Sequence, residues 1–181
     1  MHSGPRRLFW LLFPSYVAVV LISLLAAGWF AARNMRDFYL DQIASDLLDK
    51  AAITSLRLPP DLSPRTTAAV DRLCNELGNV SETRYTVILP GGRVVGDSEK
   101  DPQTMANHSD RPEIVQAYNG KVGRSMRYSD TVKRQMMYVA RPLRSPSGDI
   151  VGVVRTSLPV TALEQSFAML RGRLLVSLLW V

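Results

Sequence analysis

The sequence has few of the residues from which catalytic and metal sites are built. It contains one cysteine, Cys74, and two histidines, His2 and His108, among 181 residues. A single thiol cannot form an internal disulfide framework, so Cys74 is expected to be a core residue. The histidines lack metal-ligand spacing, Ser109 beside His108 lacks the context of a positioned nucleophile, and no glycine loop that cradles phosphate is present. We therefore expect no catalytic residue, metal or cofactor in this chain.

Charge is absent from Leu8 to Ala32. A helix of this length exceeds the roughly 20 residues needed to cross a bilayer, so the sequence predicts a transmembrane helix over 8–32. The alternative is a cleaved signal peptide with Arg6 and Arg7 as its charged start, although a signal's apolar region is usually about 7 to 15 residues.

The anchor predicts a location for the rest of the chain. Long translocated domains are largely exempt from the positive-inside rule, so residues 1–7 are expected in the cytoplasm and residues 33–173 outside a bacterial inner membrane. The net charge of +6 does not indicate a nucleic-acid partner, because most basic residues are interspersed with acidic ones and an outer domain meets no DNA. The segment from Lys100 to Arg144, however, contains nine basic residues and only four acidic ones. This local excess favours an anionic ligand.

Helical spacing continues beyond the anchor. Leu40, Ile43, Leu47 and Ala51 recur at steps of three and four and form an apolar stripe. The stripe is expected to cover the domain's own sheet, to pair with a second subunit in a homodimer, or to do both. The helix should end before Pro59. A second helix is predicted with Ser63 as N-cap, Pro64 at its first position and Gly78 past its end.

The remaining pattern predicts an α+β domain over 33–160, with a roughly five-stranded antiparallel sheet behind the long N-terminal helix. A hairpin is expected at the turn 90–92, and a short helix is expected to be closed by Gly120. The predicted strands are Tyr85–Leu89, Arg93–Asp97, Arg124–Ser129, Gln135–Pro142 and Ile150–Leu158, with the short helix at Arg111–Asn119.

The C-terminal segment returns to helical spacing. We expect a juxtamembrane helix over 161–173 and the start of a second transmembrane helix over 174–181, because an eight-residue apolar run follows Arg171 and Arg173 and is too short to span a bilayer. The alternative is a short hydrophobic tail.

Five segments in this order carry a family resemblance: TVILPGGRVVGDS (86–98), DPQTMANHSDRPEI (101–114), GKVGRSMRYSDT (120–131), MMYVARPL (136–143) and GDIVGVVRTSLP (148–159). Together they resemble the extracytoplasmic PAS-like, or single Cache, sensor region of PhoR-like phosphate-regulon sensor histidine kinases. The match covers about 34–160. Where relatives often have Asp-Gly at the hairpin turn, this chain has Gly91-Gly92.

The resemblance implies a signal-sensing, membrane-anchored part of a two-component kinase, with no enzymatic activity in this chain. A response regulator would be a partner only through the missing kinase part. The alternatives are the sensor part of a chemoreceptor or of a cyclic-dinucleotide enzyme, and a self-contained membrane-anchored interaction protein.

His108 and Arg111 are the first candidates for ligand contact. The structural alternative is a capping arrangement in which Asp110 is the N-cap and Glu113, three residues on, completes it. Arg111 opposes the helix dipole in the first turn and is expected to be matched by an anion. That anion is Glu113, Asp97 or a bound ligand.

Tyr128, Tyr138 and Arg141 complete the predicted site, in a pocket between the sheet and its covering segments. Side chains alternate across a strand, so Arg127 and Tyr128 cannot both face the pocket. Tyr128 is the preferred member, and Arg127 is expected on a solvated outer face. Tyr138 and Arg141 are likewise expected on opposite faces.

Overall fold

The computed structural model describes residues 5–59, 61–129 and 133–160, with side chains described from residue 12 onward. The chain divides into two compact units at Gln42 and Ile43. The predicted helix over 161–173 and the predicted membrane helix over 174–181 lie outside the described residues.

Helix α1 (Pro5–Arg57) contains residues of both units. This helix is long and apolar enough to cross a bilayer. Its most apolar stretch has a mean hydropathy of 2.0 and contains no buried side chain. The helix ends at Arg57, as predicted from Pro59, because the residue before a proline disfavours helical dihedrals.

The second unit is built on one five-stranded sheet in the order β2-β1-β5-β4-β3, with every neighbouring pair antiparallel. This confirms the predicted α+β fold with a long N-terminal helix and a five-stranded antiparallel sheet. The strands are β1 (Arg84–Ile88), β2 (Val94–Asp97), β3 (Gly123–Ser129), β4 (Arg134–Arg144) and β5 (Ile150–Pro159). The turn between β1 and β2 lies at residues 90–92, where the sequence predicted a hairpin. Gly91 and Gly92 adopt φ angles of 85° and 86° there, which glycine reaches without strain.

The last turns of α1 and the helix α2 (Thr67–Asn79) cover one face of the sheet. Leu47 and Ala51, two members of the predicted stripe, are fully buried, and so is Cys74 of α2, as predicted. The Thr156 hydroxyl of β5 donates to the Leu47 carbonyl at 2.8 Å. These contacts join α1 to the centre of the sheet.

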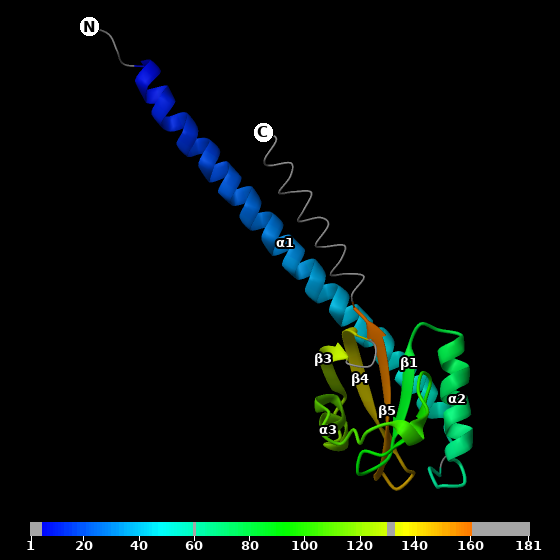
Figure 1. Ribbon diagram of the computed structural model, residues 1–181. Helices are drawn as coiled ribbons and strands as arrows, with labels where there is room; N and C mark the ends of the chain where they lie inside the picture. The colour runs from blue at the N-terminus through cyan, green and yellow to red at the C-terminus, as the bar shows by residue number, and fades with distance from the viewer. Residues whose placement is uncertain (1–4, 60, 130–132, 161–181) are drawn as a thin grey trace. The chain divides into compact units, whose positions relative to one another are not determined.

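The short helix α3 (Pro112–Tyr118) and the segment before it cover the opposite face (Figure 1). Ile114 and Ala117 of α3 pack there with Ala140 and Val153 of the sheet. A 3₁₀ turn, η1 (Pro102–Thr104), interrupts the segment between β2 and α3. Gly123 lets α3 approach β3, because a Cβ at this position would collide with the Glu113 backbone.

Two predicted helix starts are wrong. Helix α2 begins at Thr67, because the backbone N–H of Thr66 bonds to the Ser63 carbonyl at 3.0 Å and closes a turn before the helix. The N-cap of α3 is Arg111, without a side-chain cap, rather than Asp110. Glu113 does not complete a capping box, because its carboxylate is buried against the sheet.

Candidate basic pocket

A small cavity of about 80 Å³ lies on the α3 face of the sheet. Residues two apart on a strand share a face, and this alternation brings side chains of four strands together there. The lining residues are Arg84 of β1, Arg155 of β5, Tyr138 of β4, Arg127 and Ser129 of β3, and Met105, His108 and Arg111 of the covering segment. We call this cavity the basic pocket, because the described residues that line it include four arginines and no carboxylate.

Arg155 and Arg127 share one carboxylate behind the pocket wall. Glu113 Oε1 accepts from Arg127 Nη2 at 3.3 Å and from Arg155 Nη1 at 3.4 Å, and its Oε2 accepts from the Ser125 hydroxyl. Burial acts to raise the pKa of Glu113, but the Ser125 hydrogen bond and the two cations outweigh burial and the pKa is lowered. Glu113 is therefore a carboxylate anion at neutral pH.

Arg84 is held more tightly. Its Nη2 lies 2.9 Å and its Nε 3.0 Å from Asp97 Oδ1, and its Nη1 lies 3.1 Å from Glu99. The Thr86 hydroxyl donates to Asp97 at 2.8 Å and accepts from Arg155 Nη2 at 3.1 Å. One buried polar network thus connects α3 with β3, β5, β1 and β2 beneath the pocket.

Tyr138 provides an aromatic surface for two of the arginines. The guanidinium carbon of Arg127 lies 4.1 Å, and that of Arg155 5.2 Å, from the centre of the Tyr138 ring. A guanidinium at such a distance is attracted by the electron-rich ring face. The ring therefore positions the two cations without neutralising them.

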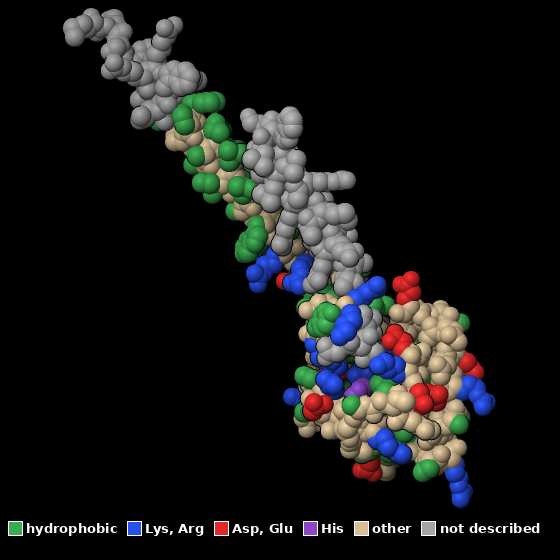
Figure 2. Space-filling model, in the orientation of Figure 1, with side chains coloured by type: hydrophobic (Ala, Val, Ile, Leu, Met, Phe, Trp, Pro, Cys, Tyr) green, Lys and Arg blue, Asp and Glu red, His purple; other side chains and the backbone are tan. Residues whose placement is uncertain are grey.

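Several donors of the pocket lack partners. Among the described residues, the buried atoms without a hydrogen-bond partner include Nε of Arg111, Arg127 and Arg155 and Nδ1 of His108, all on pocket-lining side chains. Buried polar groups are nearly always hydrogen-bonded, so a group of four unpaired atoms around one cavity requires an explanation. Figure 2 shows Lys and Arg side chains gathered around the histidine on the viewed face of this domain.

His108 is neutral in this environment. Burial, the largest cause, and the charges of Arg155, Arg111 and Arg84 together lower the pKa of His108 to about 4, against an opposing effect of Asp97. Its backbone N–H donates to the Gly92 carbonyl at 2.9 Å, which joins the covering segment to the β1–β2 turn.

The structure brings together His108, Arg111 and Tyr138 of the five predicted site residues. Tyr128 is 51% exposed on the other face of β3, and Arg127 occupies the pocket. The expected roles of this pair are therefore reversed. Arg141 does not line the pocket, because an odd spacing separates it from Tyr138. Ligand contact by these residues stays a prediction.

The carboxylate nearest to Arg111 is neither of those expected. Arg111 Nε lies 3.6 Å from Asp110 Oδ1, which is beyond a normal hydrogen bond. Glu113 and Asp97 pair with other arginines.

Sequence reasoning missed Arg84 and Arg155. Arg155 follows five apolar or small residues in β5 and precedes Thr156 and Ser157, and a charged residue within a buried strand is rarely left without a partner. Likewise, Ser125, Arg127 and Ser129 alternate with Met126 and Tyr128, which makes one face of β3 polar. These two signals could have located the pocket.

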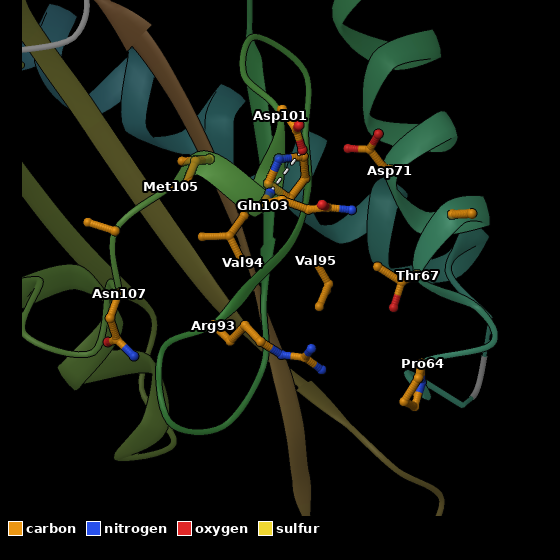
Figure 3. A pocket seen from close by; sticks show the side chains of 13 residues that line it. Pro64, Thr67, Asp71, Arg93, Val94, Val95, Asp101, Gln103, Met105 and Asn107 are labelled. Carbon is orange, nitrogen blue, oxygen red and sulfur yellow. Dashed lines mark hydrogen bonds between the residues drawn. The ribbon is translucent and has the colours of Figure 1, made fainter.

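A larger groove of about 830 Å³ lies between α2, β2 and η1 (Figure 3). Asp71 and Thr67 of α2 border it on one side and Val95 on the other. Its two lining carboxylates are already paired, since Asp71 accepts from the Asp97 backbone and Asp101 from the Gln103 backbone. The basic pocket, with its unpaired donors, is the stronger candidate for a ligand site.

No family model and no curated protein matches this chain. Solved structures match its fold. The sensor domain of the V. cholerae histidine kinase DctB aligns with a TM-score of 0.52 and 19% identity over 73% of this chain and 57% of that chain. The E. coli DcuS sensor domain aligns with a TM-score of 0.53 and 16% identity over 71% and 97%.

A chemoreceptor domain is similar to the same degree. The ligand-binding domain of the Pseudomonas aeruginosa PAO1 amino-acid chemoreceptor PctC, in complex with GABA, aligns with a TM-score of 0.52 and 12% identity over 68% of this chain and 59% of that chain. This chain thus spans less than two thirds of the DctB and PctC chains. It has the fold of Cache or PAS-like sensor domains, which in these neighbours are sensing or ligand-binding units and not catalytic ones.

Proposed function

We propose that this chain is the sensing part of a membrane-anchored bacterial receptor and that its basic pocket binds a small anion. The observation that carries the proposal is the group of unpaired buried donors on Arg111, Arg127 and Arg155. An anion in the pocket would accept hydrogen bonds from these groups, and charge-assisted hydrogen bonds of this kind are the strong ones.

The lining also restricts the class of anion. Amino-acid ligands carry an ammonium group, which requires an acceptor or an anion in the site. Among the described residues, the pocket lining contains no carboxylate, and the nearby Glu113 and Asp97 are engaged by arginines. We therefore expect an anion without an ammonium group, in contrast to the GABA of PctC.

The size of the pocket sets a second limit. One water requires about 10–15 Å³ of such a volume, so a cavity of about 80 Å³ holds roughly five to eight water-sized groups. Oxyanions and short carboxylates are within this range. The PhoR-like resemblance does not select phosphate among them, because sensors of this type often do not bind the nutrient that their pathway controls.

For the whole receptor, we propose a sensor histidine kinase in the bacterial inner membrane, with the sensor domain outside. The DctB and DcuS neighbours and the segment resemblance support this assignment. A chemoreceptor is the second candidate, supported by the PctC neighbour. The gene sequence downstream of residue 181 separates them: a kinase is expected to encode a HAMP linker and a histidine-bearing helix pair, and a chemoreceptor a long signalling helix.

We further propose that the receptor is a homodimer that uses α1. Ile53 and Leu56 are 54% and 86% exposed on this helix, although Ala51 and Leu58 are buried against its own domain. A second copy of the helix would cover these apolar side chains. A ligand would then shift the dimer only through different affinities for its two signalling states.

Isothermal titration calorimetry tests the ligand proposal. The full chain, in detergent micelles at constant ionic strength, is titrated with inorganic phosphate, sulfate, acetate, succinate, GABA and L-asparagine. We expect at least one of the four anions to bind and neither amino acid to bind. Heat from an amino acid alone, or from none of the six compounds, would contradict the proposal.

Two matched arginine variants identify the site. Arg127→Gln removes a cation from the basic pocket, and we expect it to weaken binding at least tenfold. Arg93→Gln removes an exposed arginine from the larger groove and is expected to leave binding unchanged. The reverse pattern would place the ligand in the groove.

A further inference from the structure

Glu113 is a buried carboxylate that does not line the pocket but neutralises part of its wall. Its side chain is fully buried, and it lies behind Arg127 and Arg155, outside the lining. It reaches them from α3, whereas both arginines belong to the sheet. The carboxylate therefore occupies the side of the two guanidiniums that faces away from the cavity.

The contacts of Glu113 with these arginines are long. At 3.3 and 3.4 Å they exceed the usual 2.7–2.9 Å of a charge-assisted hydrogen bond. The pair formed by Arg84 and Asp97 in the same network lies at 2.9–3.1 Å. Among the described residues, the buried Nε groups of Arg127 and Arg155 have no hydrogen-bond partner, so Glu113 compensates the charge of both arginines without pairing these donors.

We infer that Glu113 is the internal counter-anion of the basic pocket and sets its affinity for anions. This inference rests on the proposed anion site. A buried negative charge beside the site repels an entering anion and competes with it for the same two cations, and such interactions are strong where water is excluded. The same charge stabilises the empty pocket, because removing one partner leaves buried cations uncompensated. Glu113 thus makes the empty state stable at the cost of weaker ligand binding.

This role predicts opposite effects on stability and affinity. Glu113→Gln keeps the shape and removes the charge, so the empty full chain should melt at a lower temperature. The same variant should bind the anions of the calorimetric panel at least tenfold more tightly, which corresponds to about 1.4 kcal/mol. Glu113→Asp keeps the charge and should bind within about threefold of the unchanged chain.

Glu99→Gln is the matched control. It also removes a carboxylate paired with a pocket arginine, Arg84, but at a side chain that is 43% exposed, where water screens its charge. Its binding should change by less than about twofold. A purely structural role for Glu113 would make Glu113→Gln bind equally or more weakly, and that result would overturn the inference.

A second variant keeps the inference testable if Glu113→Gln does not fold. Ser125→Ala removes the hydrogen bond that lowers the pKa of Glu113 and leaves the carboxylate in place. Acidification should then tighten anion binding at a higher pH than in the unchanged chain, because Glu113 loses its charge earlier. Identical pH profiles would contradict the inference. Absence of anion binding in every variant, by contrast, would refute the proposed function itself.

Discussion

At the scale of single residues, the pocket combines strong cations with incomplete pairing. Arg84 is held at 2.9–3.1 Å by Asp97, whereas Arg127 and Arg155 contact Glu113 at 3.3 and 3.4 Å. Tight pairing of a buried charge stabilises the fold, and loose pairing leaves a site open to an outside anion. The arrangement therefore assigns a structural role to Arg84 and a binding role to the other two.

His108 gives this site a predictable response to pH. Its folded pKa of about 4 lies below the ordinary value of 6.5, so between these pH values the unfolded chain binds a proton that the folded chain does not. Stability consequently falls as the pH is lowered from about 6.5 to about 4, by about 2 to 3 kcal/mol at most.

The measurement is the free energy of unfolding of the full chain by chemical denaturation across this pH range. His108→Asn, which cannot titrate, should lose this component and show a shallower slope than the unchanged chain. Parallel slopes for the two chains would show that His108 does not carry the effect.

Residue patterns in the sequence indicated His108, Arg111 and Tyr138 correctly as residues near one cavity. The patterns did not indicate which side chains of β3 face the cavity, because an arginine such as Arg127 is compatible with a solvated surface as well as with a pocket. The placement of Arg127 depends on the Glu113 carboxylate of α3, which is only 14 residues away in sequence but belongs to a different element. Such a pairing cannot be inferred from spacing alone.

At the scale of elements, α3 covers one face of the sheet and contributes Glu113 to the buried polar network. It packs on β3, where Gly123 provides space for the Glu113 backbone.

The predicted elements matched the observed ones where period and turn residues agreed, as in the β1–β2 hairpin around Gly91 and Gly92. The start of α2 did not match, because a hydrogen-bonded turn from Ser63 to Thr66 uses the same residue types as a helix start.

Gly123→Ala tests the contact between α3 and β3. The added Cβ would collide with the Glu113 backbone, so α3 must move away, and we expect unfolding to become easier by about 2 to 4 kcal/mol, in the range of other overpacking and core effects. Gly148→Ala is the control, because its Cβ meets no neighbour and only its φ of 94° is unfavourable, by about 1 kcal/mol. Equal losses in the two variants would contradict the proposed packing role.

At the scale of the whole molecule, helix α1 contains the apolar span and also residues of the folded domain. Within the folded domain, the Leu47 carbonyl of α1 is bonded to β5, the central strand of the sheet, which carries Arg155. Arg155 of the pocket is therefore connected to α1 through its covalent neighbour Thr156, whose hydroxyl donates to the Leu47 carbonyl. Coupling along this route remains a proposal, since it requires two discrete states of the helix.

Cysteine labelling tests the proposed location. Burial raises the pKa of the native Cys74 to about 12, so Cys74 should not react with a maleimide. Glu76→Cys places a thiol on the exposed side of α2, and we expect a membrane-impermeant maleimide to label it in cells with a permeabilised outer membrane and an intact inner membrane. Labelling only after the inner membrane is disrupted would place the domain in the cytoplasm.

Disulfide cross-linking in membranes tests the proposed dimer. Leu56→Cys, on the exposed side of α1, should form a cross-linked dimer under mild oxidation, because the second copy of α1 would lie against it. Glu76→Cys on α2 should not. Equal cross-linking of both variants would indicate random collision rather than a dimer through α1.

The central claim is that the unpaired donors of the basic pocket bind a small anion. The most direct measurement is nuclear magnetic resonance of the arginine Nε–Hε groups of the full chain in micelles, assigned by single substitutions and titrated with the anion that binds best in calorimetry. We predict that Nε–Hε signals of Arg111, Arg127 and Arg155, which lack partners in the empty pocket, shift on binding, while that of Arg84, bonded to Asp97, stays in place. Unchanged signals for these three arginines at saturating anion would contradict the account.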